Sequence, residues 1–233
     1  MSQNKTYVII PAGGQSRRLG GDLPKQYHTI NGKELIAYTL SVFQNSPLCD
    51  GIIVSAQSCY FSLLNDIRIR YSFSKMRPPV EGGTERQDSV FNALNSISAQ
   101  PEDLIAVHDA ARPLLDEMHL SSVLDAARAS GAAILALSAR DTLLKGENNT
   151  VSSYLDRREI FYAQTPQVFR YSVLKDAMDR AAAEGFYGTD ESMLVRRTGR
   201  AVDIVEGSQY NFKVTTQEDI EILKKITGMP GTL

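Results

Sequence analysis

The first residues that suggest chemistry lie between positions 7 and 25. Tyr7-Val8-Ile9-Ile10 is an apolar, β-branched run that predicts a strand buried on both faces. The chain then changes to Ala12-Gly13-Gly14, small residues that leave their backbone N–H groups accessible. Glycine also permits the positive φ values that aim successive N–H groups at one anion. The same loop holds three cations, Arg17, Arg18 and Lys25. This combination predicts a binding site for a polyphosphate.

The loop matches neither of the two common phosphate-binding motifs. Lys25 is followed by Gln26, and the chain lacks the Walker A pattern G-x-x-x-x-G-K-[ST]. The dinucleotide fingerprint G-x-G-x-x-G is also absent. A tight turn without a ligand is the alternative, but no acidic cluster beside the three cations neutralises them. We therefore expect a phosphate loop of another kind.

Two further groups of polar and small residues follow predicted strands. Gly82-Gly83-Thr84-Glu85-Arg86-Gln87-Asp88-Ser89 is a turn leading into a helix N-terminus, where N–H groups can meet an anion or a base edge. His108-Asp109-Ala110-Ala111-Arg112-Pro113 follows an apolar run. Asp109 has two interpretations, a cap of the next turn or a Mg²⁺ ligand opposite a triphosphate. We expect His108 to be packed or hydrogen-bonded, because no catalytic set or metal-ligand spacing accompanies it.

Alternating strands and helices must position these groups. Hydrophobic periodicity predicts further strands at 51–55, 104–108, 132–137 and 202–205. It predicts helices at 34–43, 60–67, 86–97, 118–129, 176–184, 190–197 and 218–226, the last with Thr215 and Glu218 at capping-box spacing. The alternation predicts an α/β fold, a mostly parallel twisted sheet with helices on both faces, in one domain over residues 1–233. Ligands bind outside the carboxyl ends of the strands in such sheets.

One segment interrupts the alternation. Residues 141–156 read as two short strands around the polar turn Gly146-Glu147-Asn148-Asn149-Thr150, which predicts a β-hairpin. An isolated hairpin is marginally stable in water unless it packs on something. Two interpretations remain open, a surface decoration and a contact with another subunit.

Composition excludes several classes of protein. The apolar share is 42% and the charged share 22%, as expected for a globular protein with a full core. A net charge of −2 argues against nucleic acid as a partner. No apolar run approaches the roughly 18 residues of a membrane span, and no export signal is visible at the N-terminus. Cys49 and Cys59 are expected to be free thiols, which favours a cytoplasmic location.

Ordered motifs along the chain resemble one enzyme family. They are P-A-G-G-x-x-R-R-L, L-P-K-Q-Y, G-G-T-E-R-x-D-S-V, V-H-D-A-A-R-P, R-D-T, D-R, Q-T-P-Q-x-F, T-D-E-S and N-x-K-V-T. Each is weak alone, but in this order they resemble the 2-C-methyl-D-erythritol 4-phosphate cytidylyltransferases of non-mevalonate isoprenoid synthesis. The resemblance extends from Val8 to about Ile222. It implies a Rossmann-like nucleotidyltransferase fold, with CTP and a sugar-alcohol phosphate, 2-C-methyl-D-erythritol 4-phosphate, as substrates, Mg²⁺ as cofactor and pyrophosphate as product.

The resemblance also implies roles for individual residues. The two catalytic cations of the family correspond to Arg18 and Lys25, and the metal ligand to Asp109. The nucleotide site corresponds to Ala12, Gly13, Gly14, Gly83, Arg86, Ser89 and Ala110. The sugar-phosphate pocket corresponds to Arg112, Thr142, Arg157, Thr165 and Lys213. The resemblance further implies a homodimer in which the arm, residues 141–158, reaches over the partner.

Several positions depart from the usual pattern of this family. Gly13, Ser16 and Leu19 replace an alanine, a glycine and a methionine, and Thr84 replaces a frequent aspartate. The P-A-G-G loop leans toward the sister family that uses ribitol 5-phosphate, whereas the motifs around Asp109, Arg157 and Asp190 resemble the methylerythritol branch. A nucleotide-binding module without turnover and a nicotinamide oxidoreductase are the alternatives of other classes. Release of pyrophosphate from CTP would exclude the module without turnover, and absence of nicotinamide binding would exclude the oxidoreductase.

Overall fold

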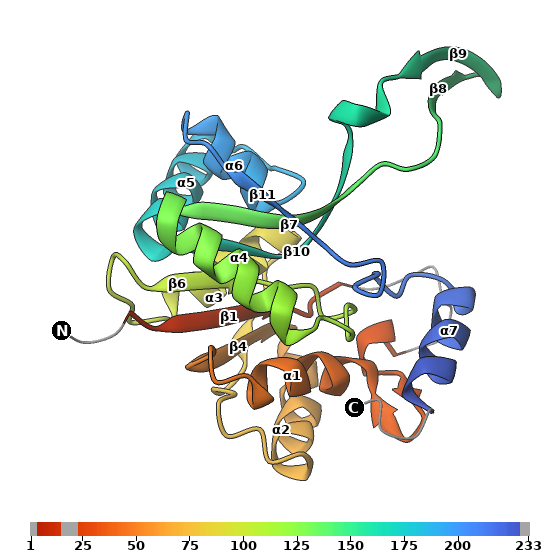
Figure 1. Cartoon of the computed structure of the whole chain (residues 1–233). Coiled ribbons are helices and arrows are strands. Elements are labelled where there is room, and N and C mark those ends of the chain that lie inside the picture. The colour runs from red at the N-terminus through yellow and green to blue at the C-terminus, as the bar shows by residue number, and fades with distance from the viewer. Residues whose placement is uncertain (1–3, 15–22, 229–233) are drawn as a thin grey trace.

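Strands and helices alternate around a central sheet (Figure 1). The computed structural model of the chain describes residues 4–14 and 23–228. The strands of the central sheet are β1 Thr6–Pro11, β4 Gly51–Ala56, β5 Val80–Glu81, β6 Leu104–Val107, β7 Ala132–Ser138, β10 Phe161–Arg170 and β11 Asp203–Glu206. The helices are α1 Leu35–Asn45, α2 Phe61–Arg70, α3 Arg86–Asn95, α4 Glu117–Ser130, α5 Tyr171–Glu184, α6 Glu191–Arg197 and α7 Gln217–Thr227.

The order of the strands is β11-β7-β10-β6-β1-β4-β5. β1 lies between β6 and β4 and is parallel to both, and β5 and β11 are parallel to their neighbours. The predicted α/β fold with a mostly parallel sheet is therefore confirmed. Because β1, β4 and β6 run the same way, the loops that follow them meet at one edge of the sheet.

β10 is the exception, and the sequence analysis did not predict it. It runs antiparallel between β6 and β7. Its sequence, FYAQTPQVFR, contains a proline, which argues against a central strand because proline cannot donate to the ladder. In the structure Pro166 lies where the register with β7 shifts, between Ala163 and Gln167, so the missing N–H does not interrupt regular pairing.

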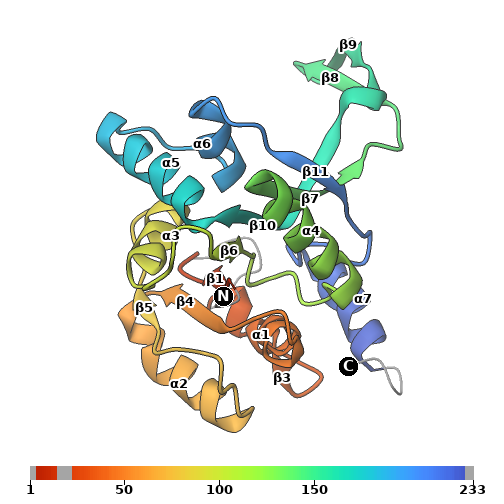
Figure 2. The same cartoon turned by 60° about the vertical axis from the view of Figure 1, so that its left-hand side comes forward.

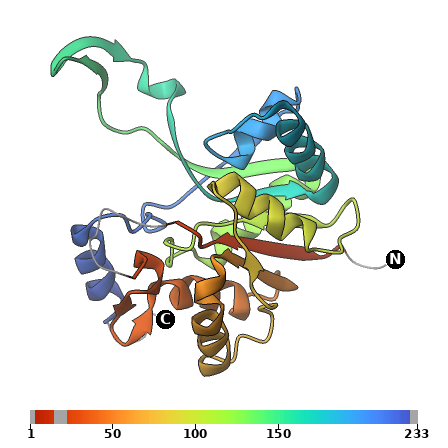
Figure 3. The same cartoon turned by 180° about the vertical axis from the view of Figure 1, so that it is seen from behind.

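Helices cover both faces of the sheet, as predicted (Figure 2). Along β1, Val8 and Ile10 pack in the core with α1, α2 and α4, whereas Tyr7 and Ile9 pack in the core with α3, α5 and α6. This alternation follows from the two-residue repeat of a strand, which sends successive side chains to opposite faces. Seen from behind, α3 lies in front of the sheet (Figure 3).

A third, smaller core joins distant parts of the chain. The short strands β2 Thr29–Ile30 and β3 Lys33–Glu34, which the sequence analysis did not predict, form a hairpin near α7. Ile30 and Leu35 pack there with Val214 and Leu223. The segment before α7 is thereby held beside the loop that follows β6.

The predicted hairpin is present as strands β8 Leu143–Glu147 and β9 Thr150–Leu155. Asn148 and Asn149 both have positive φ, 50° and 60°, as the two-residue turn of a hairpin with right-handed twist requires. The hairpin projects away from the rest of the molecule (Figures 1 and 3), and nearly all its residues are exposed.

The start of α5 and the capping box of α7 differ from the prediction. α5 begins at Tyr171, five residues before the predicted start at 176, because Val173 and Leu174 pack in the core and extend its apolar face. The capping box of α7 uses Thr216 and Asp219, so the prediction of Thr215 and Glu218 was wrong by one residue. The Thr216 hydroxyl accepts from the Asp219 N–H.

Candidate active site

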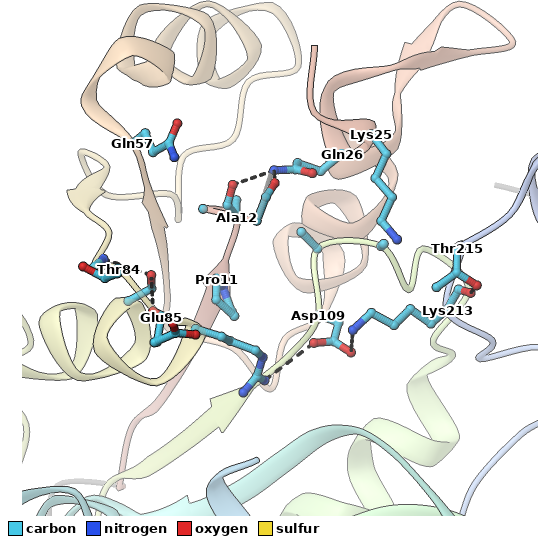
Figure 4. A pocket seen from close by; sticks show the side chains of 17 residues that line it. Pro11, Ala12, Lys25, Gln26, Gln57, Thr84, Glu85, Asp109, Lys213 and Thr215 are labelled. Carbon is cyan, nitrogen blue, oxygen red and sulfur yellow. Dashed lines mark hydrogen bonds and ion pairs between the residues drawn. The ribbon is translucent and has the colours of Figure 1, made fainter. Parts of the chain in front are cut away.

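A cavity of about 750 Å³ lies at the carboxyl ends of β1, β4 and β6 (Figure 4). All seven residues predicted for the nucleotide line it, together with Lys25, the predicted metal ligand Asp109 and, from the predicted sugar-phosphate pocket, Lys213: the seven are Ala12, Gly13, Gly14, Gly83, Arg86, Ser89 and Ala110. The cavity therefore brings together three loops that are distant in sequence. These loops follow β1, β5 and β6, which run parallel with β4 between β1 and β5, so their carboxyl ends lie at the same edge of the sheet.

Gln26 holds the loop after β1 in place. Its amide Nε2 donates to the carbonyl oxygens of Ala12, at 2.6 Å, and Gly14, at 3.2 Å. The Ala12 N–H donates to Ser55 O of the neighbouring strand at 2.7 Å. Because the carbonyls of Ala12 and Gly14 both accept from Gln26, the backbone on either side of Gly13 has a defined position at the cavity wall.

The second glycine loop packs tightly on α3. A side chain at Gly83 would place its Cβ 2.1 Å from Cβ of Asp88, so only glycine fits there. The Gly83 N–H donates to the Ser89 hydroxyl at 3.0 Å, and this hydroxyl donates to Glu85 O at 3.1 Å. Ser89 also lies 3.5 Å from the position of a Cβ on Gly13. One buried serine thus connects both glycine loops.

Asp109 is buried at the end of β6 and faces three cations. Its carboxylate lies 3.1 Å from Lys213 Nζ, 3.2 Å from Arg112 Nε and 3.5 Å from Arg86 Nη2. Burial alone would raise the pKa of Asp109, but Lys213, Arg86 and Arg112 outweigh it and hold this pKa well below its usual range. Asp109 is therefore an anion at neutral pH. The Asp109 carboxylate could therefore bind a cation through its oxygens, and the three cationic side chains around it give this part of the cavity a positive charge.

Arg86 is shared between Asp109 and a second buried carboxylate. Arg86 Nη1 donates to Glu191 Oε1 at 2.7 Å, and Glu191 is 1% exposed. Burial raises the pKa of Glu191, and the charge of Arg86 opposes that rise. Burial would lower the pKa of Arg86, but the two carboxylates raise it overall. The two terminal nitrogens of Arg86 thus pair with different carboxylates, Nη1 with Glu191 and Nη2 with Asp109, and these contacts fix the position of the guanidinium.

Two lysines from different parts of the chain, Lys25 and Lys213, also line the cavity. Lys25 Nζ donates to Val214 O at 2.6 Å, while Lys213 points at Asp109 (Figure 4). Val214 is itself anchored, because its N–H donates to Ala111 O at 2.8 Å. The segment before α7 therefore forms part of the cavity, and it brings one lysine toward the carboxylate.

His108 is fully buried, as expected, and is part of a hydrogen-bonded network. Its Nε2 lies 3.0 Å from Arg112 O, and its Nδ1 lies 3.2 Å from the Thr165 hydroxyl. Burial lowers the pKa of His108 to about 4. Asn211, also fully buried, donates to Thr165 O at 2.8 Å, and its backbone carbonyl accepts from Arg112 Nη1 at 2.8 Å.

Comparison with known proteins places this arrangement in one family. The family model described as IspD, 2-C-methyl-D-erythritol 4-phosphate cytidylyltransferase, matches residues 6–228. The chain belongs to this family. A relative of that name in Syntrophus aciditrophicus is 41% identical over 230 residues, which cover 96% of this chain and 98% of the relative. Another, in Geotalea uraniireducens, is 40% identical over 91% of this chain and 92% of its own length.

Solved structures agree with this assignment. The crystal structure of the Francisella tularensis 2-C-methyl-D-erythritol 4-phosphate cytidylyltransferase superposes with a TM-score of 0.83 at 35% identity, covering 95% of this chain and 99% of that one. The enzyme of that name from Thermus thermophilus gives 0.79 at 28% identity, covering 97% and 100%. The family resemblance of the sequence motifs is thereby confirmed.

The remaining residues with a role implied by the family lie elsewhere. Arg112 and Thr165 lie behind Asp109 and contact its side chain and backbone. Thr142 and Arg157 are exposed at the base of the arm and do not line the cavity, and Arg157 Nη1 donates to Arg140 O at 2.7 Å. Arg18 lies outside the described residues. The roles of these five residues therefore stay predictions.

Sequence reasoning assigned no role to three buried residues that support the site. Gln26, Glu191 and Asn211 stand inside the L-P-K-Q-Y, T-D-E-S and N-x-K-V-T motifs, so their positions were noted without a function. The feature of the sequence that could have identified them is that each is a polar residue inside one of these motifs. Only the structure shows that each is buried and which group it holds.

The length and the polarity of the helices bear on whether the chain could span a membrane. Within residues 4–14 and 23–228, none is long and apolar enough to cross a bilayer.

Proposed function

We propose that this protein transfers CMP from CTP to 2-C-methyl-D-erythritol 4-phosphate and releases pyrophosphate. The observation that supports it most directly is Asp109, a buried carboxylate among Arg86, Arg112 and Lys213 at the wall of a cavity that the glycine loop after β1 also lines. Membership in the cytidylyltransferase family supplies the identity of the substrates.

The reaction is an in-line displacement at the α-phosphorus of CTP. An oxygen of the acceptor phosphate forms the new P–O bond, and the bond to the pyrophosphate oxygen breaks. The acceptor phosphate is already anionic at neutral pH, so neither a protein nucleophile nor a strong general base is needed. Catalysis then consists of positioning and electrostatic stabilisation.

The predicted site residues have distinct tasks in this scheme. Lys25 and Arg18 neutralise charge that develops on the α-phosphate and the leaving pyrophosphate. The loop Ala12-Gly13-Gly14 holds the triphosphate, and the glycine loop with Ser89 holds the cytidine. Lys213, which contacts Asp109 in the structure, holds the attacking phosphate together with Arg157.

The donor set at Asp109 fits Mg²⁺. Mg²⁺ prefers oxygen ligands, uses one or two protein carboxylates and takes the remaining ligands from phosphates and water. No group of three or more His, Cys, Asp and Glu side chains placed to hold a metal is found among the residues that the structure describes. Asp109 would hold the ion, and the substrate would complete the site. Bound Mg²⁺ supplies positive charge beside the phosphate oxygens.

The arm completes the acceptor pocket of a second copy of the chain. Thr142 and Arg157 are too exposed to form a pocket within their own chain, and the hairpin presents apolar side chains to solvent, among them Leu144 and Tyr154, the latter 69% exposed. A homodimer of two-fold symmetry would cover these side chains and bring both polar residues to the partner's cavity. The reaction would take place in the cytoplasm, as expected from the free cysteines.

A single assay tests the function. The purified protein is given CTP and Mg²⁺ with either methylerythritol phosphate or ribitol 5-phosphate, and pyrophosphate release is measured for both. We expect a higher kcat/KM for methylerythritol phosphate. A higher value for ribitol phosphate, or no release with either, would contradict the proposal.

A further inference from the structure

Glu191 is a buried carboxylate at the start of α6, and one of its oxygens holds Arg86. Its Oε1 accepts from Arg86 Nη1 at 2.7 Å, whereas Oε2 has no hydrogen-bond partner within the described part of the chain. The residue is 1% exposed, and its helix neighbours Leu194 and Val195 are buried in the core. Burying a carboxylate is costly, and a buried ion pair often contributes no more to stability than apolar side chains of similar volume. Stability alone therefore does not explain a carboxylate at this position.

The two helix starts that carry this ion pair are tied together. Arg86 is the first residue of α3, and Glu191 is the first residue of α6. The next residue of α3, Gln87, accepts from the Gly188 N–H at 2.9 Å and donates to Phe186 O at 2.9 Å. These bonds hold α3 against the segment before α6. Both side chains of the pair are therefore attached to backbone that is itself held in place.

The guanidinium of Arg86 lies between Glu191 and the cavity. Its Nη2 is 3.5 Å from Asp109 Oδ1, a longer contact than its 2.7 Å bond to Glu191. A guanidinium has five N–H donors in one plane. Among the residues that the structure describes, it donates a hydrogen bond to Glu191 alone. Because the side chain is 33% exposed and lines the cavity, its other donors can meet the oxygen and nitrogen acceptors of a bound nucleotide.

We infer that Glu191 is a positioning residue that acts through Arg86 at the nucleotide site. Glu191 binds one terminal nitrogen of the guanidinium and thereby fixes its plane, so that Arg86 presents its other donors to the nucleotide. Without Glu191 the guanidinium would turn toward its other carboxylate partner, Asp109, and away from that orientation. The inference rests on the proposed function for the identity of the nucleotide, CTP.

The kinetic test compares Glu191→Leu, which removes the acceptor, with Glu191→Gln, which retains an oxygen for Arg86. Removing a residue that orients a ligand-binding group typically costs about 10- to 100-fold. We expect Glu191→Leu to raise the KM for CTP by about that factor, with the KM for methylerythritol phosphate changed by no more than about twofold. Glu191→Gln should avoid most of this rise. A merely structural role would instead lower the amount of active enzyme and leave both KM values unchanged.

A double variant shows whether Glu191 acts through Arg86. In Arg86→Met/Glu191→Leu the KM for CTP should equal that of Arg86→Met, because the second change has no guanidinium left to release. Glu34→Leu is the matched control, since Glu34 is a buried carboxylate that pairs with Arg70 and does not line the cavity. Its KM for CTP should not change. An unchanged KM for CTP in Glu191→Leu, or additive rises in the double variant, would overturn the inference.

A spectroscopic measurement needs no ligand and still decides the question if Glu191→Leu does not fold. In the protein labelled with ¹⁵N-arginine, the side-chain signals of Arg86 are identified by their loss in Arg86→Met. We expect separate signals for its two terminal nitrogens, because a guanidinium held by a carboxylate rotates slowly, and a shift of these signals in Glu191→Gln. One averaged signal in the wild-type protein, or signals that Glu191→Gln leaves in place, would overturn the inference. A wild-type protein with a held guanidinium that releases no pyrophosphate would contradict the proposed function alone.

Discussion

The loop after β6 and the arm carry predicted site residues in opposite surroundings. Asp109 is 8% exposed, and its neighbours come from four separate parts of the same chain. Arg157 is exposed, and its guanidinium donates to Arg140 O on the other side of the arm's base. A buried carboxylate with paired cations is organised before any ligand arrives. An exposed arginine gains an equally defined position only from another surface.

This difference divides the proposed site into two halves. The metal and nucleotide half is built within one chain, since the cavity is lined by the loops after β1, β5 and β6 together with Lys213. The proposed acceptor half includes Thr142 and Arg157, which do not line that cavity within one chain. Substitutions in the first half should act within one subunit, and substitutions in the second should act across subunits.

The largest effect is expected for Lys25→Ala. The loss of one preorganised charge donor typically lowers kcat by about 10²- to 10³-fold. The melting temperature should change little, because the side chain lies at the cavity wall. Lys175→Ala, which removes a half-buried lysine that pairs with Asp179 and does not line the cavity, is the control and should retain its kcat. A Lys25→Ala enzyme with more than half of the parent kcat would remove Lys25 from the mechanism.

Asp109→Asn should weaken the productive complex with Mg²⁺ and CTP. The site would lose the carboxylate that offers an oxygen ligand, so we expect roughly tenfold to hundredfold lower activity and a higher Mg²⁺ requirement. Titration of activity with Mg²⁺ at saturating CTP measures both. If Asp109 only caps the following turn, activity at saturating Mg²⁺ would survive while thermal stability fell.

A mixture of two inactive proteins tests the division between subunits. Lys25→Ala and Arg157→Ala are combined under conditions where subunits exchange. In a mixed two-fold dimer one site collects both lesions and the other neither, so random exchange should restore about a quarter of wild-type activity. Proven exchange without recovered activity would mean that both residues serve one site in the same chain.

The smallest expected effect is a difference in unfolding free energy between two glycine variants, one in the loop before α3 and one on the arm. Gly83→Ala would place a Cβ 2.1 Å from Asp88, and such overpacking typically costs about 1–3 kcal/mol in the free energy of unfolding. Gly146→Ala on the arm meets only Thr150 O at 3.9 Å, so we expect a change within about 0.5 kcal/mol. Denaturant unfolding of both variants measures the difference. Equal destabilisation would contradict the tight packing of the second glycine loop.

Local patterns in the sequence determined most of the elements. The apolar runs of β1, β4, β6 and β7 and the turn at Asn148 and Asn149 are readable, because strand burial and positive φ restrict the residue types directly. The motifs placed Asp109, Lys25 and Lys213 among the site residues before any contact was known. The order of the loops along parallel strands also predicted that they would meet.

Only the tertiary structure decided which groups are partners. β10 was not predicted because its proline argues against a central strand, and only pairing with β6 and β7 stabilises it there. The contacts of Thr165 with His108 and Asp109, and of Glu191 with Arg86, join residues 56 to 105 positions apart. Local propensity depends on neighbouring residues and does not predict contacts between residues so far apart in sequence. These contacts form only when the strands pack and the side chains become buried and hydrogen-bonded across the sheet.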